Sequence, residues 1–286
     1  MIIGIDLGTT NSLAAYFKDG ETKIIPNRLG KHLTPSIVSV DEEGKVSVGE
    51  TAKEYGYLHP LNAAGVFKRT MGTDKKYRLG DYEYTSKELS AFVLRALKED
   101  AESFLGEKVT EAVISVPAYF DEKRRKATRQ AGELAGLKVD RIISEPTAAA
   151  IAYGLYEKHG NTKFLVFDLG GGTFDVSVLE LFENILEVRA VAGDNFLGGE
   201  DFTRILEDAV LEEKEIDRDS LSEKDLIRLR KAAEEAKLAF SDKGEADIVF
   251  KYKEEELTCH MDTKEYESRC FDLFEKIKKS VQRSMS

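Results

Sequence analysis

The feature that most constrains the fold of this chain is a long-period internal repeat. Residues 2–9 read Ile-Ile-Gly-Ile-Asp-Leu-Gly-Thr, and residues 165–173 read Leu-Val-Phe-Asp-Leu-Gly-Gly-Gly-Thr. Each copy is an apolar strand that ends in Asp-Leu-Gly, followed by a turn of small residues and a second strand signal. A duplication of this kind predicts two related lobes with a cleft between them. Both Asp-Leu-Gly turns are expected to face that cleft.

Strand and helix signals alternate along the rest of the chain, which predicts an α/β fold. In the first copy, strands are expected at residues 2–6, 13–17, 22–26, 36–40, 45–48, 109–116 and 139–144, with helices at 86–105, 121–135 and 146–156. In the second copy, strands are expected at 163–169, 174–181, 185–192, 246–252 and 256–260, with helices at 199–213, 222–240 and 263–281.

The two copies differ in length. After its long helix the first copy continues through strand, helix, strand and helix, whereas the second stops at the helix over residues 263–281. We therefore expect a first lobe over residues 1–160 and a second lobe over 161–286 that is incomplete at its C-terminus. A fragment of this kind is expected to bind its ligand more weakly than an extended version.

Composition excludes several classes of protein. The chain has 286 residues, a net charge of −11 and scattered lysines and arginines without a basic stripe, which argues against nucleic acid as a partner. No apolar run is long enough to span a membrane, and the N-terminus lacks the pattern of a signal peptide. Cys259 and Cys270 are the only cysteines, which fits a reducing cytoplasm and no disulfide framework.

The two glycine-containing turns have the chemistry that a phosphate chain requires. Phosphate oxygens need backbone N–H donors at close range, and glycine allows that approach. Gly8, Thr9, Thr10 and Asn11 form the first turn, and residues 170–173 form the second. Threonine hydroxyls add further donors. The turns therefore predict a site for a nucleotide phosphate chain.

Each turn follows an aspartate, Asp6 or Asp168. Mg²⁺ keeps several waters and takes few direct protein ligands, so these two carboxylates could share one hydrated ion. A single Asp-x-Gly turn is more often only a hairpin turn, and the paired occurrence carries the argument. The chain has neither a Gly-x-x-x-x-Gly-Lys-Ser/Thr loop nor a kinase pattern.

Two further carboxylates have positions that suggest a site. Glu145 comes just before a helix start, where an acidic residue also stabilises the helix dipole without any other role. Asp175 begins a strand, although aspartate disfavours strand interiors. We interpret both as carboxylates of the cleft.

Several segments resemble the signatures of the seventy-kilodalton heat-shock chaperones of the DnaK type, in the right order along the chain. These are residues 5–12, 116–120, 145–150, 167–176 and 197–202. The region around residues 67–72 resembles the HscC-like branch in particular. The resemblance implies the actin-like ATPase fold, with duplicated lobes related to ribonuclease H. It also implies ATP hydrolysis that is coupled to peptide binding by a separate domain, which we do not expect within residues 1–286.

The resemblance also implies roles for individual residues, with ATP or ADP, Mg²⁺ and a possible K⁺ as cofactors. Asp6 and Asp168 would organise the metal, and Lys68 would orient the attacking water. Lys68 alone could equally be part of a solvated helix end. The other implied site residues are Glu145, Thr173 and Asp175 as catalytic residues and Gly8, Thr9, Thr10, Asn11, Gly170, Gly171, Gly172, Gly198, Gly199 and Glu200 as nucleotide contacts.

The adenosine side departs from the family pattern. Glu234, Lys237 and Ser241 match the helix that contacts adenosine in the family, but Leu238 stands where an arginine is usual. The glycine-rich adenosine loop is not in this chain. By itself, the segment would read as a charged surface helix with i,i+4 pairs.

The implied partners are a J-domain co-chaperone, a nucleotide exchange factor and the chaperone's own peptide-binding domain. Three rival functions remain. A filament subunit of the same fold would polymerise with ATP, and a sugar kinase would consume ATP only with an acceptor. A fragment that serves as a nucleotide-poor scaffold would show no useful turnover.

Overall fold

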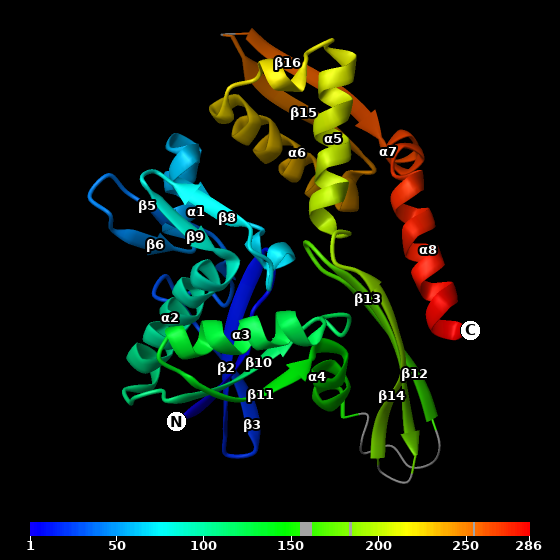
Figure 1. The fold of residues 1–286 in the computed structure, drawn as a ribbon. Helices are drawn as coiled ribbons and strands as arrows, with labels where there is room; N and C mark the ends of the chain where they lie inside the picture. Colours follow the sequence, from blue (N-terminus) through cyan, green and yellow to red (C-terminus); the bar gives the residue numbers. More distant parts are fainter. Residues whose placement is uncertain (155–161, 183–184, 254) are drawn as a thin grey trace.

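The computed structural model describes residues 1–154, 162–182, 185–253 and 255–286 (Figure 1). The end of the helix expected at 146–156 and the expected lobe boundary at 160/161 lie outside the described residues. We refer to residues 1–154 as the N-terminal part and to residues 162–286 as the C-terminal part.

A mixed sheet organises the N-terminal part. Its order is β11 (Lys138–Ser144), β10 (Glu111–Val116), β1 (Ile2–Asp6), β2 (Asn11–Lys18) and β3 (Glu21–Ile25), with the short β4 (Thr34–Pro35) paired to β2. The pairs β1–β10 and β10–β11 are parallel, whereas β1–β2 and β2–β3 are antiparallel. The carboxyl ends of β1 and β10 therefore meet at one edge of the sheet.

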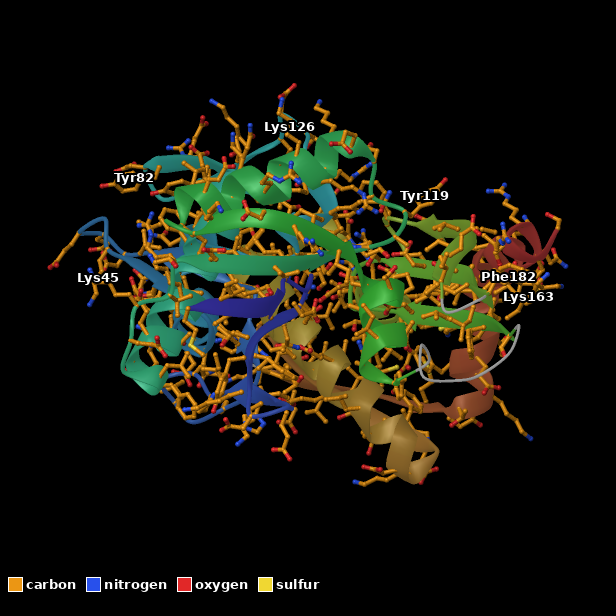
Figure 2. All side chains as sticks on the ribbon, turned by 90° about the horizontal axis from the view of Figure 1, so that it is seen from below. Lys45, Tyr82, Tyr119, Lys126, Lys163 and Phe182 are labelled. Carbon is orange, nitrogen blue, oxygen red and sulfur yellow. The ribbon has the colours of Figure 1, made fainter. Side chains whose placement is uncertain are left out.

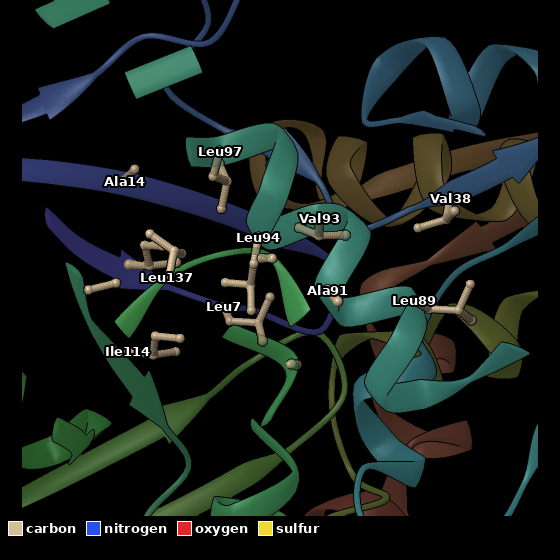
Figure 3. Packing of buried hydrophobic residues seen from close by; sticks show 14 of the residues in the cluster. Leu7, Ala14, Val38, Leu89, Ala91, Val93, Leu94, Leu97, Ile114 and Leu137 are labelled. Atoms are coloured by element: carbon tan, nitrogen blue, oxygen red, sulfur yellow. The ribbon is translucent and has the colours of Figure 1, made fainter. Parts of the chain in front are cut away.

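Helices cover this sheet and form its core. The helices are α2 (Ser86–Leu105), α3 (Glu122–Leu134) and α4 (Glu145–Ala152). A capping box of Thr85 and Glu88 begins α2, and Gly106 in the left-handed conformation ends it. The apolar face of α2, with Leu94 and Leu97, packs in one buried cluster with Leu7 and Ile114 of the sheet side (Figure 3).

A smaller αβ unit stands on top of the N-terminal part. It contains β5 (Val38–Val40), β6 (Val46–Val48), β7 (Ala63–Ala64), α1 (Glu50–Leu58), and the hairpin of β8 (Lys76–Leu79) and β9 (Tyr82–Thr85). The 3-10 turns η1 (Pro60–Asn62) and η2 (Phe67–Thr70) connect these pieces. The sequence patterns did not predict α1, β8 or β9.

The C-terminal part has two layers. The antiparallel sheet β12 (Thr162–Leu169), β13 (Phe174–Phe182) and β14 (Ile185–Asp194) is covered on one face by α8 (Phe271–Met285). The second layer consists of α5 (Gly199–Glu213), η4 (Arg218–Ser220), α6 (Glu223–Lys243), and the hairpin of β15 (Glu245–Tyr252) and β16 (Glu255–Asp262). Figure 1 shows this layer above the β12–β14 sheet, with α7 (Thr263–Arg269) leading into α8.

The repeat is confirmed as structure, since β1–β2 and β12–β13 are equivalent antiparallel pairs that start each part. The environments of the two first strands differ. Ile3, Ile5 and Leu7 are 1%, 3% and 1% exposed. Their counterparts on β12 are 51%, 50% and 41% exposed, namely Leu165, Phe167 and Leu169. The reason is that α8 contacts β13 and β14, while β12 forms the edge of the sheet.

The prediction of one continuous helix over residues 263–281 is wrong, because the structure divides this segment at Cys270 into α7 and α8. The two halves belong to different cores. In α7, the Tyr266 ring stacks on Phe240 with centroids 4.8 Å apart. In α8, Leu273 and Ile277 pack against the β13–β14 cluster. One straight helix could not serve both surfaces.

In the described part of the chain, no helix is both long and apolar enough to cross a membrane.

Candidate functional site

The two predicted turns meet in space. A Cβ atom built on Gly171 would overlap the hydroxyl of Thr10, and one built on Gly172 would overlap the side chain of Thr9. Only glycine permits so close an approach of the second turn to the first. The Thr10 Oγ1 atom is buried and has no hydrogen-bond partner among the described residues. A buried hydroxyl without a partner is costly, so this atom is available to an incoming acceptor.

The start of α5 is joined to the second turn. The Gly199 N–H donates to the Gly170 carbonyl at 2.9 Å, and the Glu200 N–H donates to the Gly171 carbonyl at 2.8 Å. A Cβ on Gly198 would come within 2.6 Å of the Gly172 nitrogen. The turn and the helix N-terminus therefore form one unit, and the positive end of a helix favours anions.

Next to the turns, Lys68 lies among the predicted carboxylates. Its Nζ donates to Glu145 Oε1 at 3.0 Å and lies 5.7 Å from the centre of the Phe120 ring. The side chains of Lys68 and Glu145 are only 4% and 18% exposed. A cation buried in this way must be paired, so the solvated helix end that we considered for Lys68 is wrong.

The carboxylates influence one another. Burial, followed by the charge of Asp6 and offset by Lys68, raises the pKa of Glu145 above its usual value. Burial and then the charge of Asp6 also raise the pKa of Asp168. Burial, together with the charge of Glu145, raises the pKa of Asp175 to about 7. In the described part of the chain, four acidic groups thus share one region with Lys68, which leaves an excess of negative charge.

This excess of charge fits a cation. Among the described residues, no three acidic, histidine or cysteine side chains are grouped closely enough to ligate one metal ion. Mg²⁺ accepts few direct protein ligands and keeps its waters, so the residues present fit a hydrated ion held by two carboxylates. The raised pKa values of Glu145 and Asp168 are consistent with groups whose natural counter-charge is a cation.

Three partners of the site were not predicted from the sequence. The Ser115 hydroxyl donates to Asp6 Oδ1 at 2.8 Å, and the Tyr119 N–H donates to Asp175 Oδ1 at 3.2 Å. In Figure 2, Tyr119 lies where the N-terminal part meets the C-terminal part. The Arg69 side chain, from the N-terminal part, donates to the Gly172 carbonyl of the C-terminal part. The parallel register that places Ser115 beside Asp6 is the one signal that a sequence-based model of the sheet could have used.

One of the predicted adenosine-side residues, Glu234, lines a cavity next to the first turn. This cavity of about 270 Å³ is bordered by Thr10 and Asn11 of the first turn and by Glu200 and Glu234 across from them. A larger hollow of about 450 Å³ beside α2 contains none of the predicted residues. The smaller cavity is therefore the one that continues from the turns.

Other predicted nucleotide contacts have partners within the protein. Lys237 Nζ donates to the Gly199 carbonyl at 2.9 Å and to Thr203 Oγ1 at 2.7 Å. Glu200 forms an ion pair with Arg230. Leu238 is exposed, and the side chain of Ser241 lies outside the described residues.

Comparison with known proteins agrees with this geometry. The family model described as Hsp70 protein matches residues 2–79 and 73–286. The chain belongs to the Hsp70 family. It therefore has the actin-like ATPase fold of that family. The finer resemblance to the HscC-like branch stays a prediction.

Named relatives of this Hsp70 chain are chaperones. It is 51% identical over 251 residues to "Chaperone protein DnaK" of Thermotoga petrophila, which covers 86% of this chain and 42% of that protein. It is 45% identical over 295 residues to the protein of the same name from Thermosipho africanus, which covers 100% of this chain and 49% of that protein. The chain spans about half the length of the curated relatives that it matches.

Proposed function

We propose that this chain binds ATP or ADP with Mg²⁺ between a first lobe, residues 1–160, and a second lobe, residues 161–286. The observation that supports this most strongly is the contact between the turns at residues 8–11 and 170–173, next to four carboxylates and one buried lysine. Backbone N–H groups of the two turns would hold the phosphates. The N-terminus of α5 would contribute its dipole, since the N–H groups of Gly199 and Glu200 already donate to the second turn. The unpartnered Thr10 hydroxyl would donate to a phosphate oxygen.

We further propose that the bound nucleotide is hydrolysed. Phosphoryl transfer needs mainly positioned groups and electrostatic stabilisation from the protein. Mg²⁺, when bound, would neutralise charge on the phosphates. Lys68 would hold the attacking water, with its own position fixed by Glu145 and by the Phe120 ring. Asp175, with a pKa near 7, could accept the proton of that water, and Thr173 would donate to the transferred phosphate.

The adenosine would extend into the 270 Å³ cavity beside Glu234. Lys237 would act indirectly, since it fixes the start of α5 through Gly199 and Thr203. Leu238 is exposed and would offer no stacking cation to the base. The adenosine side of this chain is thus expected to contribute less affinity than the phosphate side.

The relatives' names motivate a proposal for the whole protein. We propose that ATP turnover at this site controls peptide binding by a separate domain, with a J-domain co-chaperone and an exchange factor as partners. K⁺ is a further cofactor candidate. The two free and buried cysteines are compatible with a reducing cytoplasm, where we place the protein.

Titration calorimetry with ATP and with ADP, each with and without Mg²⁺, tests the binding proposal. We expect binding that requires Mg²⁺ and that Asp168→Asn weakens by about tenfold or more, the scale of a lost charged contact. Asp81→Asn, an exposed aspartate far from the turns in sequence, is the matched control. Heats that stay at the level of dilution at millimolar nucleotide would refute the proposal.

A further inference from the structure

Arg69 reaches from η2, next to Lys68, across to the C-terminal part. Its Nε donates to the Gly172 carbonyl at 2.7 Å. Its two terminal nitrogens donate to the carboxylate of Asp201 at 3.3 and 2.5 Å. The Arg69 and Asp201 side chains are 15% and 25% exposed, so the pair is largely shielded from water. The planar guanidinium makes three contacts at once, which an ammonium group could not reproduce.

Both acceptors of Arg69 belong to the unit that presents the second turn. Gly172 is part of that turn, and Asp201 lies in the first turn of α5. Asp201 Oδ2 also accepts the Gly198 N–H at 2.8 Å. Arg69 therefore holds the second turn and the start of α5 from the same side.

The contact with Gly172 also fixes the direction of a backbone group. Across a trans peptide, the carbonyl oxygen and the following N–H point in opposite directions. With the Gly172 carbonyl directed at Arg69, the Thr173 N–H points away from Arg69. A rotated peptide would exchange an N–H donor for a carbonyl oxygen, which repels phosphate.

Other contacts across the two parts, among the described residues, are weaker. The Tyr119 N–H donates to Asp175 at 3.2 Å, and Lys231 Nζ lies 5.2 Å from the centre of the Tyr57 ring. Three charge-assisted hydrogen bonds from one side chain are expected to outweigh either of them. Among the described residues, Arg69 and Asp201 are the ion pair that joins the two parts.

We propose that Arg69 is a positioning residue, which closes the two lobes on each other and keeps the second turn oriented to accept phosphate. This inference rests on the proposed function, since phosphate is the ligand of that function. The apparent affinity for nucleotide then depends on the fraction of molecules in the closed arrangement. Loss of the arginine would lower that fraction without removing any group that touches the nucleotide.

The test measures lobe closure and nucleotide affinity separately. Spin labels on Glu43→Cys and Asp242→Cys, both exposed positions in opposite lobes, report the distance distribution between the lobes. Calorimetry with ADP and Mg²⁺ reports affinity. Both are measured for Arg69→Ala, Arg69→Lys and Asp201→Asn. The control is Arg204→Ala. Arg204 is an exposed arginine of α5 whose ion pair with Asp208, at 3.9 Å, stays within the C-terminal part.

We expect Arg69→Ala to lengthen or broaden the distance distribution and to raise the dissociation constant for ADP by about ten- to a hundredfold, as for lost hydrogen bonds to a charged group. Arg69→Lys should be intermediate. Asp201→Asn retains an oxygen for the Gly198 N–H, so it should open the lobes without unfolding α5. Arg204→Ala should match the wild type.

The proposal is overturned if Arg69→Ala leaves the distance distribution unchanged. It is equally overturned if the lobes open while the affinity for ADP stays the same, because the clamp would then not position the turn. If the wild-type chain binds no nucleotide, the proposed function fails. In that case, the distance measurement alone decides whether Arg69 holds the lobes together.

Discussion

Removal of the buried Lys68 charge should produce a stability defect whose size depends on pH. At the observed 3.0 Å from Glu145, the Coulomb attraction is about 5 kcal/mol for an effective dielectric constant of about 20. Breaking a buried pair from one side typically costs about 3–5 kcal/mol, because the other charge is left without a partner. We therefore expect Lys68→Met to destabilise the protein without ligands by about 3–5 kcal/mol at pH 8.

The defect should shrink as the pH falls. Without Lys68, the pKa of Glu145 rises further above its unfolded value, so the folded state binds more protons than the unfolded state. Stability then increases toward low pH, by about 1.4 kcal/mol per pH unit for each proton taken up. We expect the penalty at pH 5.5 to be clearly smaller than at pH 8.

Urea unfolding at the two pH values measures this difference, provided that the slope m stays the same in both proteins. Lys126→Met is the matched control, since Lys126 lies exposed on α3 (Figure 2). A penalty below about 1 kcal/mol at pH 8, or an equal penalty at both pH values, would refute the electrostatic reasoning.

In single-turnover assays, Lys68→Ala should keep ATP binding and hydrolyse ATP about 10²-fold more slowly than the wild type. If Lys68→Ala hydrolyses ATP at the wild-type rate, Lys68 has no role in the mechanism.

Three other predictions concern Asp175, Gly171 and Phe167. The pKa of Asp175, about 7 when folded, makes stability fall as pH rises from about 4 to 7, so Asp175→Asn should raise the melting temperature at pH 8 and flatten this dependence. Gly171→Ala should weaken ADP binding at least about tenfold through its clash with Thr10. Gly4→Ala should not, because its added Cβ would lie 3.9 Å from the Ala15 carbonyl oxygen, an ordinary contact distance; equal affinities for the two variants would contradict the packing argument. The exposed apolar side chains of β12 at Leu165, Phe167 and Leu169 are expected to promote self-association at high protein concentration, so Phe167→Lys should lower the mass measured by light scattering; an equal mass for variant and wild type would contradict this.

Local patterns were sufficient to predict the scaffold of the site. Alternating apolar residues and glycines placed β1, β2, β12 and β13 and both turns, since these features depend on neighbours in sequence. The duplication then predicted that the turns face each other. The helix predicted at residues 86–105 from its apolar periodicity has the same bounds as α2.

The parts that could not be predicted depend on contacts between distant segments. Ser115 meets Asp6 only through the register of a parallel pair, and Arg69 meets Asp201 only because the two lobes close. By itself, Arg69 reads as an ordinary surface arginine. The break at Cys270 has the same origin, since the helical periodicity continues through it while the two flanking helices pack on different cores.

The unequal burial of the two equivalent strands has a consequence for local unfolding. Full burial of a leucine, isoleucine or phenylalanine contributes about 1.5–3 kcal/mol, and the half-exposed side chains of β12 forgo much of that. Amide protons of β12 should therefore exchange with solvent through smaller openings than those of β1. The Asp6 turn therefore follows a strand that opens rarely, and the Asp168 turn follows a strand that opens more easily. Ligand binding should then slow hydrogen exchange mainly around Asp168. The first copy of the repeat would keep its conformation on binding, and the second copy would adjust to the ligand.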